Sequence, residues 1–149
     1  MPQVTTLGDR LLVALGHVPT AGQERAARAL ERLMATTKEH TALVLKGYAG
    51  TGKTSLIGAL VKVLTAERRP VVLLAPTGRA ARVLSTFAGK EASTIHRRIY
   101  RSSGDEEGYA SVRVGANRDA GALFIVDEAS MIGRQGGGDG GFGGRDLLG

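Results

Sequence analysis

Short apolar runs alternate with segments of helical periodicity between residues 20 and 128. Apolar runs over 41–46, 71–75 and 123–128 are bounded by polar residues, which is typical of buried strands. Apolar residues recur at helical spacing over 20–35, 53–64 and 79–87, and a shorter helix is predicted over 93–100. Because strands that alternate with helices form parallel sheets, the pattern predicts an α/β fold with ligands at the carboxyl ends of the strands.

Two of the predicted helices and one further strand carry more specific expectations. Thr20 with Gln23 three residues later has the pattern of a capping box, which gives Gln23 a structural role beside any functional one. An exposed strand is expected over 109–114, inside a polar and irregular segment. The helix over 79–87 is expected to bury four side chains, Ala80, Val83, Leu84 and Phe87.

The composition narrows the class of protein. A chain of 149 residues with 42% hydrophobic residues suits one globular domain, and the absence of cysteine excludes disulfides and thiolate metal sites. No apolar run has the length of a membrane span, and the N-terminus lacks a signal pattern, so we expect no membrane partner and a cytoplasmic location. We expect a helical segment over 1–40, a partial globular domain over 41–132 and a glycine-rich, disordered tail over 133–149.

The segment 47–54, Gly-Tyr-Ala-Gly-Thr-Gly-Lys-Thr, fits the phosphate-binding pattern G-x-x-x-x-G-K-[ST]. Glycine lets backbone amides approach phosphates, and the following helix directs its unpaired N–H groups at the same anion. We expect Lys53 to reach the β/γ-phosphates of ATP and Thr54 to ligate Mg²⁺. The remaining nucleotide contacts are expected from the loop residues Gly47, Ala49, Gly50, Thr51 and Gly52.

The run over 123–128 ends in two carboxylates, Asp127 and Glu128. If the phosphate loop binds ATP, Asp127 can hold the Mg²⁺ and Glu128 can orient or deprotonate a water aimed at the γ-phosphate. The alternative is a strand that merely runs out into solvent.

Positive charge is concentrated in one window. The net charge is +6 with a pI of about 10.2, and residues 76–101 carry six Lys or Arg against one acid, Glu91. This excess predicts a polyanionic partner such as nucleic acid, and a solvated basic surface is the alternative.

Taken together, the motifs resemble those of the amino-terminal, RecA-like P-loop ATPase domain of superfamily-one DNA helicases of the RecD-like and Dda-like kind. Besides the phosphate loop, residues 75–81 resemble motif Ia, residues 90–97 motif Ib and residues 126–131 motif II. The resemblance implies that residues 41–132 form a partial RecA-like P-loop ATPase domain and that the protein moves on single-stranded DNA. Gln23 stands where an adenine-reading glutamine is expected. It implies DNA contacts from Pro76, Thr77, Gly78 and Arg79 and from Thr94, His96 and Arg97.

The sequence also departs from this family. The family continues with a further strand, a glutamine motif and a second RecA-like domain that supplies arginine residues, and the 149 residues contain none of these. In the family's sheet this further strand lies between the strand before the phosphate loop and the strand ending at Asp127. Without it, these two strands would lose the neighbour with which each of them pairs. We therefore expect weak ATPase activity alone and a second domain or partner chain. Two other hypotheses stay open, a non-catalytic nucleotide- or nucleic-acid-binding fragment and a P-loop phosphotransferase.

Overall fold

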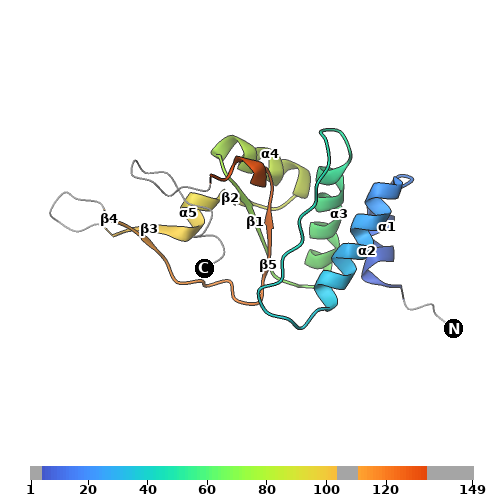
Figure 1. The fold of residues 1–149 in the computed structure, drawn as a ribbon, viewed down its shortest axis with the longest axis horizontal. Helices are drawn as coiled ribbons and strands as arrows, with labels where there is room; N and C mark the ends of the chain where they lie inside the picture. Colours follow the sequence, from blue (N-terminus) through green and yellow to red (C-terminus); the bar gives the residue numbers. More distant parts are fainter. Residues whose placement is uncertain (1–4, 104–110, 134–149) are drawn as a thin grey trace. The chain divides into compact units, whose positions relative to one another are not determined.

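The computed structural model describes residues 5–103 and 111–133, drawn in colour in Figure 1. The chain divides into two compact units. We call Met1–Arg69 with Phe87–Gly89 the helical unit, and Pro70–Thr86 with Lys90–Gly149 the sheet unit. Most of the predicted glycine-rich tail, residues 134–149, lies outside the described residues.

The helical unit consists of α1 (Leu7–Ala14), α2 (Ala21–Ala35) and α3 (Lys53–Ala66), which pack against one another (Figure 1). The helices predicted over 20–35 and 53–64 are thereby confirmed. Both α1 and α2 begin with a capping box, and the one on α2 is the predicted pair Thr20 and Gln23. The core of the unit is aliphatic, with the fully buried side chains Leu11, Leu56, Val61 and Leu64.

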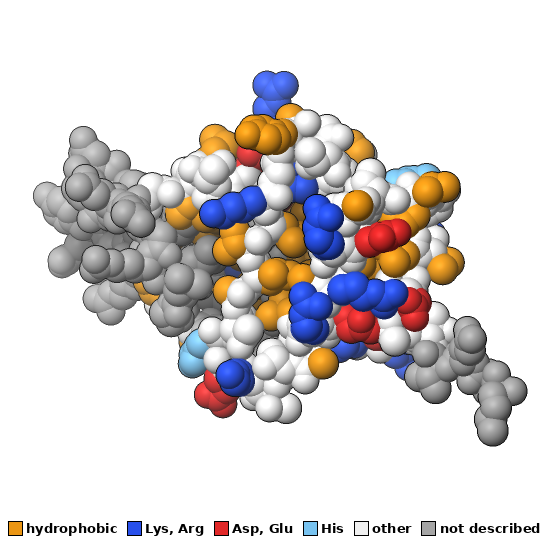
Figure 2. Space-filling view, turned by 45° about the vertical axis from the view of Figure 1, so that its right-hand side comes forward, with side chains coloured by type: hydrophobic (Ala, Val, Ile, Leu, Met, Phe, Trp, Pro, Cys, Tyr) orange, Lys and Arg blue, Asp and Glu red, His pale blue; other side chains and the backbone are white. Residues whose placement is uncertain are grey.

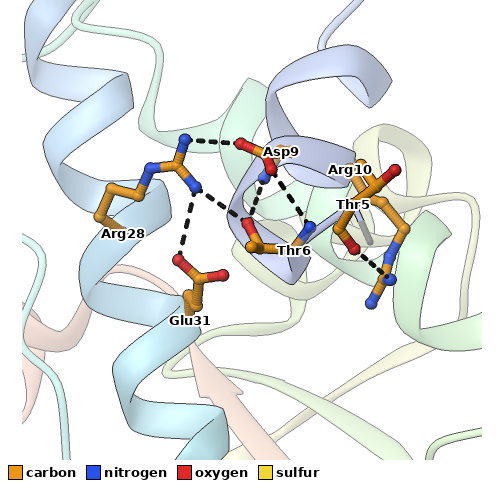
Figure 3. Close-up of polar contacts among 6 residues, drawn as sticks. All are labelled: Thr5, Thr6, Asp9, Arg10, Arg28 and Glu31. Atoms are coloured by element: carbon orange, nitrogen blue, oxygen red, sulfur yellow. Dashed lines mark hydrogen bonds and ion pairs between the residues drawn. The ribbon is translucent and has the colours of Figure 1, made fainter. Parts of the chain in front are cut away.

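A polar cluster joins α1 to α2 (Figure 3). Arg28 donates to Asp9 Oδ1 at 2.6 Å, to Thr6 Oγ1 at 3.0 Å and to Glu31 Oε2 at 3.4 Å. The hydrogen bond from the Arg28 side chain lowers the pKa of Asp9 below its ordinary value. Figure 2, which turns the right-hand side of Figure 1 forward, shows acidic side chains beside basic ones on that face.

The sheet unit contains three parallel strands in the order β2-β1-β5, namely Ala92–Thr94, Val71–Ala75 and Leu123–Val126. Two helices, α4 (Gly78–Ala88) and α5 (Ile95–Ile99), follow β1 and β2 along the chain. Two further strands, β3 (Tyr100–Ser103) and β4 (Ser111–Val114), form an antiparallel pair, and a 3₁₀ turn, η1 (Ala129–Met131), follows β5. The α/β class with a parallel sheet is thus confirmed, and β4 lies within the predicted strand over 109–114, whose first two residues are outside the described range.

The strand predicted over 41–46 is wrong. The segment is irregular, with Leu43 and Leu45 half-buried and Val44 72% exposed. A strand exists only through pairing with another strand, and no described residue pairs with this segment. Apolar alternation alone therefore did not make it a strand.

The buried strand predicted over 123–128 is correct in position but wrong in burial. It ends at Val126, and Phe124 is 38% exposed while its neighbours are half-buried. Among the described residues β5 has a strand neighbour, β1, on one side only. An edge strand keeps part of its surface open to solvent, which explains the difference.

Helix α4 buries only part of the predicted face, because of the four predicted side chains Leu84 is buried and Ala80 is half-buried. Ala81 and Leu84 are buried, whereas Val83 is 49% exposed and Phe87 is 63% exposed. The apolar positions allow two overlapping stripes, and the packing around Leu84 selects the one that includes Ala81. The helix ends at Ala88, one residue beyond the predicted end, and Gly89 follows with φ +64°. Across the described helices, none is both long and apolar enough to cross a membrane.

Candidate nucleotide site and nucleic-acid interface

The phosphate loop is a tight turn that leads directly into α3. Thr51 donates to the Tyr48 carbonyl from its backbone N–H at 3.3 Å and from its hydroxyl at 2.7 Å. Gly50 and Gly52 adopt the left-handed conformation, with φ +77° and +83°. Ala49, which directly precedes Gly50, is exposed. The loop thus needs glycine at the two positions where its direction reverses.

Two glycines of the loop also allow close approaches. A Cβ on Gly47 would lie 2.8 Å from Thr51 Oγ1, and a Cβ on Gly52 would lie 2.3 Å from Gln23 Nε2. A Cβ on Gly50 would meet nothing within 4 Å, so there only the backbone conformation demands glycine. The pattern of glycines is therefore a geometric requirement of the loop and of its neighbour on α2.

The Lys53 side chain folds back over the loop. Its Nζ donates to the Gly47 carbonyl, to the Tyr48 carbonyl at 2.8 Å and, more weakly, to Thr51 Oγ1 at 3.4 Å. This places an ammonium group against the carbonyls of the turn, where it can exchange carbonyl partners for phosphate oxygens. The predicted role of Lys53 fits this geometry, although phosphate contact itself stays a prediction.

The N-terminus of α3 differs from those of the other described α-helices. At the starts of α1, α2, α4 and α5 a threonine hydroxyl accepts a backbone N–H of the first turn, and these threonines are Thr6, Thr20, Thr77 and Thr94 respectively. The N-cap of α3 is Gly52, which provides no side-chain acceptor. The positive end of a 14-residue helix is thus left without a side-chain cap beside Lys53, which is the arrangement that binds phosphate in proteins.

Gln23 connects α2 to this loop. It is 4% exposed, and its Nε2 donates to the Gly52 carbonyl at 3.3 Å. Its Oε1 accepts the Thr20 backbone N–H at 3.0 Å. Sequence reasoning found the capping pair but not the bond to Gly52, because a contact across 29 positions leaves no local pattern.

In the sheet unit, three groups of candidate residues meet at one edge. The parallel register pairs Ala75 with Thr94 and Leu74 with Val126, so the three strands end side by side. Thr77 follows β1, Thr94 ends β2 and Asp127 follows β5, with the Asp127 N–H donating to the Leu74 carbonyl at 3.0 Å. The candidate DNA contacts and the candidate metal ligand thus share the carboxyl edge of this sheet.

The residues predicted to contact DNA are accessible at this edge. Thr77, Gly78, Arg79, His96 and Arg97 are exposed, and Pro76 and Thr94 are half-buried. Both threonines accept a helix N–H, which leaves the hydroxyl hydrogen able to donate to a phosphate oxygen. The His96 and Tyr100 rings lie with centroids 4.7 Å apart, and Tyr100 was not among the predicted residues.

Arg98 is engaged within the protein. Its Nε and Nη2 donate to the two carboxylate oxygens of Asp119, at 3.0 and 2.5 Å. Sequence reasoning missed this pair, because Asp119 lies 21 positions away in an irregular segment. The pairing removes part of the positive charge of the basic window, whose exposed cations still include Arg79, Arg82, Lys90 and Arg97.

Asp127 and Glu128 differ in environment. Asp127 is half-buried, and its Oδ1 accepts the Glu128 backbone N–H at 2.9 Å. Glu128 is exposed and has φ +53°, a left-handed conformation that costs about 1–3 kcal/mol for a residue other than glycine. Strain of this kind tends to occur at functional positions, which fits the predicted role of Glu128.

The candidate magnesium ligands are Thr54 and Asp127. A hydroxyl and a carboxylate supply the oxygen donors that Mg²⁺ prefers, so the residue types fit. Thr54 belongs to the helical unit and Asp127 to the sheet unit. In the described part of the chain, no group of three or more His, Asp or Glu side chains forms a metal cluster of its own.

Residues 19–137 match a protein family described as AAA domain. The ATP-dependent DNA helicase dda of Enterobacteria phage T4 is 38% identical over 78 residues, which are 52% of this chain and 17% of that helicase. The ATP-dependent RecD2 DNA helicase of Deinococcus radiodurans is 39% identical over 95 residues, which are 63% of this chain and 12% of that helicase. The chain thus spans less than a fifth of the length of either relative. No solved structure matches it significantly.

Proposed function

Because this chain belongs to the AAA-domain family and to the RecA-like ATPase domains of superfamily-one helicases of the RecD and Dda kind, we propose that it couples ATP hydrolysis to movement on single-stranded DNA. Nucleotide binding is a property of the family. The proposal adds that the nucleotide is ATP with Mg²⁺, that the track is single-stranded DNA, and that the protein acts in the cytoplasm, where both are present.

The observation that carries the proposal is the uncapped start of α3 with Lys53 folded over the loop. Loop amides from 47–54 and the first amides of α3 would hold the phosphates, and Lys53 would neutralise the β/γ-phosphates. Thr54 and Asp127 would hold Mg²⁺, which when bound offsets the negative charge of the phosphates. Glu128 would orient or deprotonate the attacking water.

The DNA strand is proposed to lie along the carboxyl edge of the sheet. Thr77 and Thr94 would donate to its phosphates, and Arg79, His96 and Arg97 would neutralise them. Pro76 and Gly78 would form the surface over which the backbone passes. We further propose that a second RecA-like domain or a partner chain supplies arginine side chains to the γ-phosphate, an effect worth roughly 10³–10⁵ in rate in phosphoryl-transfer enzymes.

ATP hydrolysis by the 149-residue chain, with and without single-stranded DNA, tests the nucleotide site. We expect slow turnover that DNA accelerates and that Lys53→Ala abolishes, whereas Lys62→Ala on the exposed side of α3 leaves it unchanged. Tight ATP binding without any turnover would instead favour a non-catalytic binding fragment. Turnover that ignores DNA but requires a small acceptor would favour a phosphotransferase.

The DNA edge has its own test in the salt dependence of binding to an oligonucleotide. Removing one phosphate contact on a single strand makes the negative slope of log K against log salt shallower, decreasing its magnitude by about 0.7. We expect this decrease for Arg97→Ala and no change for Arg32→Ala, an exposed arginine of α2. Equal slopes for the two variants would contradict a DNA contact by Arg97.

A further inference from the structure

Gln23 is the one buried polar or charged side chain among the described residues, at 4% exposure. Both polar atoms of its amide have a partner within the protein, because Oε1 accepts the Thr20 backbone N–H and Nε2 donates to the Gly52 carbonyl. Its own backbone N–H donates to Thr20 Oγ1 at 3.1 Å. A side chain buried in this way has little surface to offer a ligand in this conformation.

The bond to Gly52 falls on the residue that turns the loop into the helix. Gly52 has φ +83°, and its carbonyl also accepts the Leu56 N–H at 3.1 Å, the first hydrogen bond of α3. The Gly52 carbonyl is therefore held from two directions, by α3 and by Gln23 on α2. The absent Cβ of Gly52 is what permits the approach, because it would lie 2.3 Å from Nε2.

We propose that Gln23 is a positioning residue for the phosphate loop, acting on the triphosphate through Gly52 and independently of the base. Fixing the Gly52 peptide fixes the orientation of the amides that follow it, at Lys53 and Thr54, and so the direction in which they point at phosphate. This differs from reading adenine, which would make Gln23 matter only for nucleotides with that base. The inference rests on the proposed nucleotide site.

The test compares Gln23→Ala with the wild-type chain for binding of ATP, GTP and inorganic tripolyphosphate. Loss of one hydrogen bond that orders the loop should weaken all three by a similar factor, about 2- to 10-fold. Thr20→Ala is the matched control, because it removes the side-chain cap of α2 while leaving the Gln23–Gly52 bond. We expect this control to lower thermal stability without changing tripolyphosphate affinity.

Gln23→Met removes the hydrogen bond without adding a charge beside the phosphates. A methionine side chain of similar length fills the site but cannot donate to the Gly52 carbonyl, so we expect a folded protein with weakened affinity for all three ligands. A loss confined to ATP would overturn the proposal in favour of base reading. Wild-type affinity in Gln23→Met, or equal effects of Gln23→Ala and Thr20→Ala, would reduce Gln23 to a helix cap and overturn the proposal as well.

A measurement without nucleotide distinguishes failure of this inference from failure of the proposed function. Amide hydrogen exchange at Lys53 and Thr54 in the nucleotide-free chain should be faster in Gln23→Ala than in Thr20→Ala. Equal exchange in the two variants would overturn the inference even if ATP binds. If exchange responds as expected while the wild-type chain binds no triphosphate, the proposed function fails and the coupling between Gln23 and the loop remains.

Discussion

Replacement of Gly52 by alanine tests how tightly α2 and the phosphate loop are fitted together. The new methyl group would meet Gln23 Nε2 at 2.3 Å, and the backbone would have to keep φ +83°. Gly50 offers a matched control, because it has φ +77° but nothing within 4 Å of its virtual Cβ. The two substitutions therefore share the backbone strain and differ in the steric contact.

The expected magnitudes follow from these two effects. A left-handed conformation costs an alanine about 1–2 kcal/mol, which applies to both variants. In Gly52→Ala the Gln23 amide must also move away, which breaks its hydrogen bond to the Gly52 carbonyl and removes about 0.5–1.5 kcal/mol more. For a chain of this size 1 kcal/mol corresponds to about 2–4 °C in melting temperature. Gly52→Ala should therefore melt a few degrees below Gly50→Ala.

Thermal unfolding followed by circular dichroism measures the difference directly. The double variant Gln23→Ala/Gly52→Ala adds the decisive comparison, because the methyl group then has no amide to displace. We expect Gly52→Ala to cost no more than Gly50→Ala once Gln23 is alanine, a coupling of about 1 kcal/mol. If Gly52→Ala and Gly50→Ala melt at the same temperature in the Gln23 background, the argument from close approach is refuted.

Two further predictions concern stability. Leu84→Ala should destabilise the protein by about 2–5 kcal/mol because Leu84 is fully buried. Phe87→Ala, on the exposed face of α4, should change the free energy of unfolding by about 0.5 kcal/mol or less. Urea unfolding measures both, and a larger loss of stability for Phe87→Ala than for Leu84→Ala would contradict the assignment of faces. Asp9 has a lowered pKa through its bond to Arg28, so its contribution is complete above about pH 4 and is lost as the pH falls through the lowered pKa. The difference in melting temperature between the wild type and Asp9→Asn should accordingly shrink from pH 7 to pH 3, and a constant difference would exclude this linkage.

The sequence by itself determined the elements whose evidence is local. The apolar spacing of α2 and α3, the capping box at Thr20 and the run Val71–Ala75 are each contained in neighbouring residues, and all are confirmed. The glycines of 47–54 are equally local, because a turn with positive φ has few residues that can adopt it. The parallel α/β class followed from the alternation of these elements.

Tertiary structure decided whatever depends on a partner distant in the sequence. The segment 41–46 has a strand-like composition but finds no pairing partner among the described residues, whereas the polar run Ala92–Thr94 becomes β2 because β1 lies beside it. Packing chose the face of α4, since two apolar stripes compete on that helix. The bond from Gln23 to Gly52 joins residues 29 positions apart. Backbone pairing, packing and long-range hydrogen bonds depend on which surfaces meet, and periodicity within one segment contains no information about its partner.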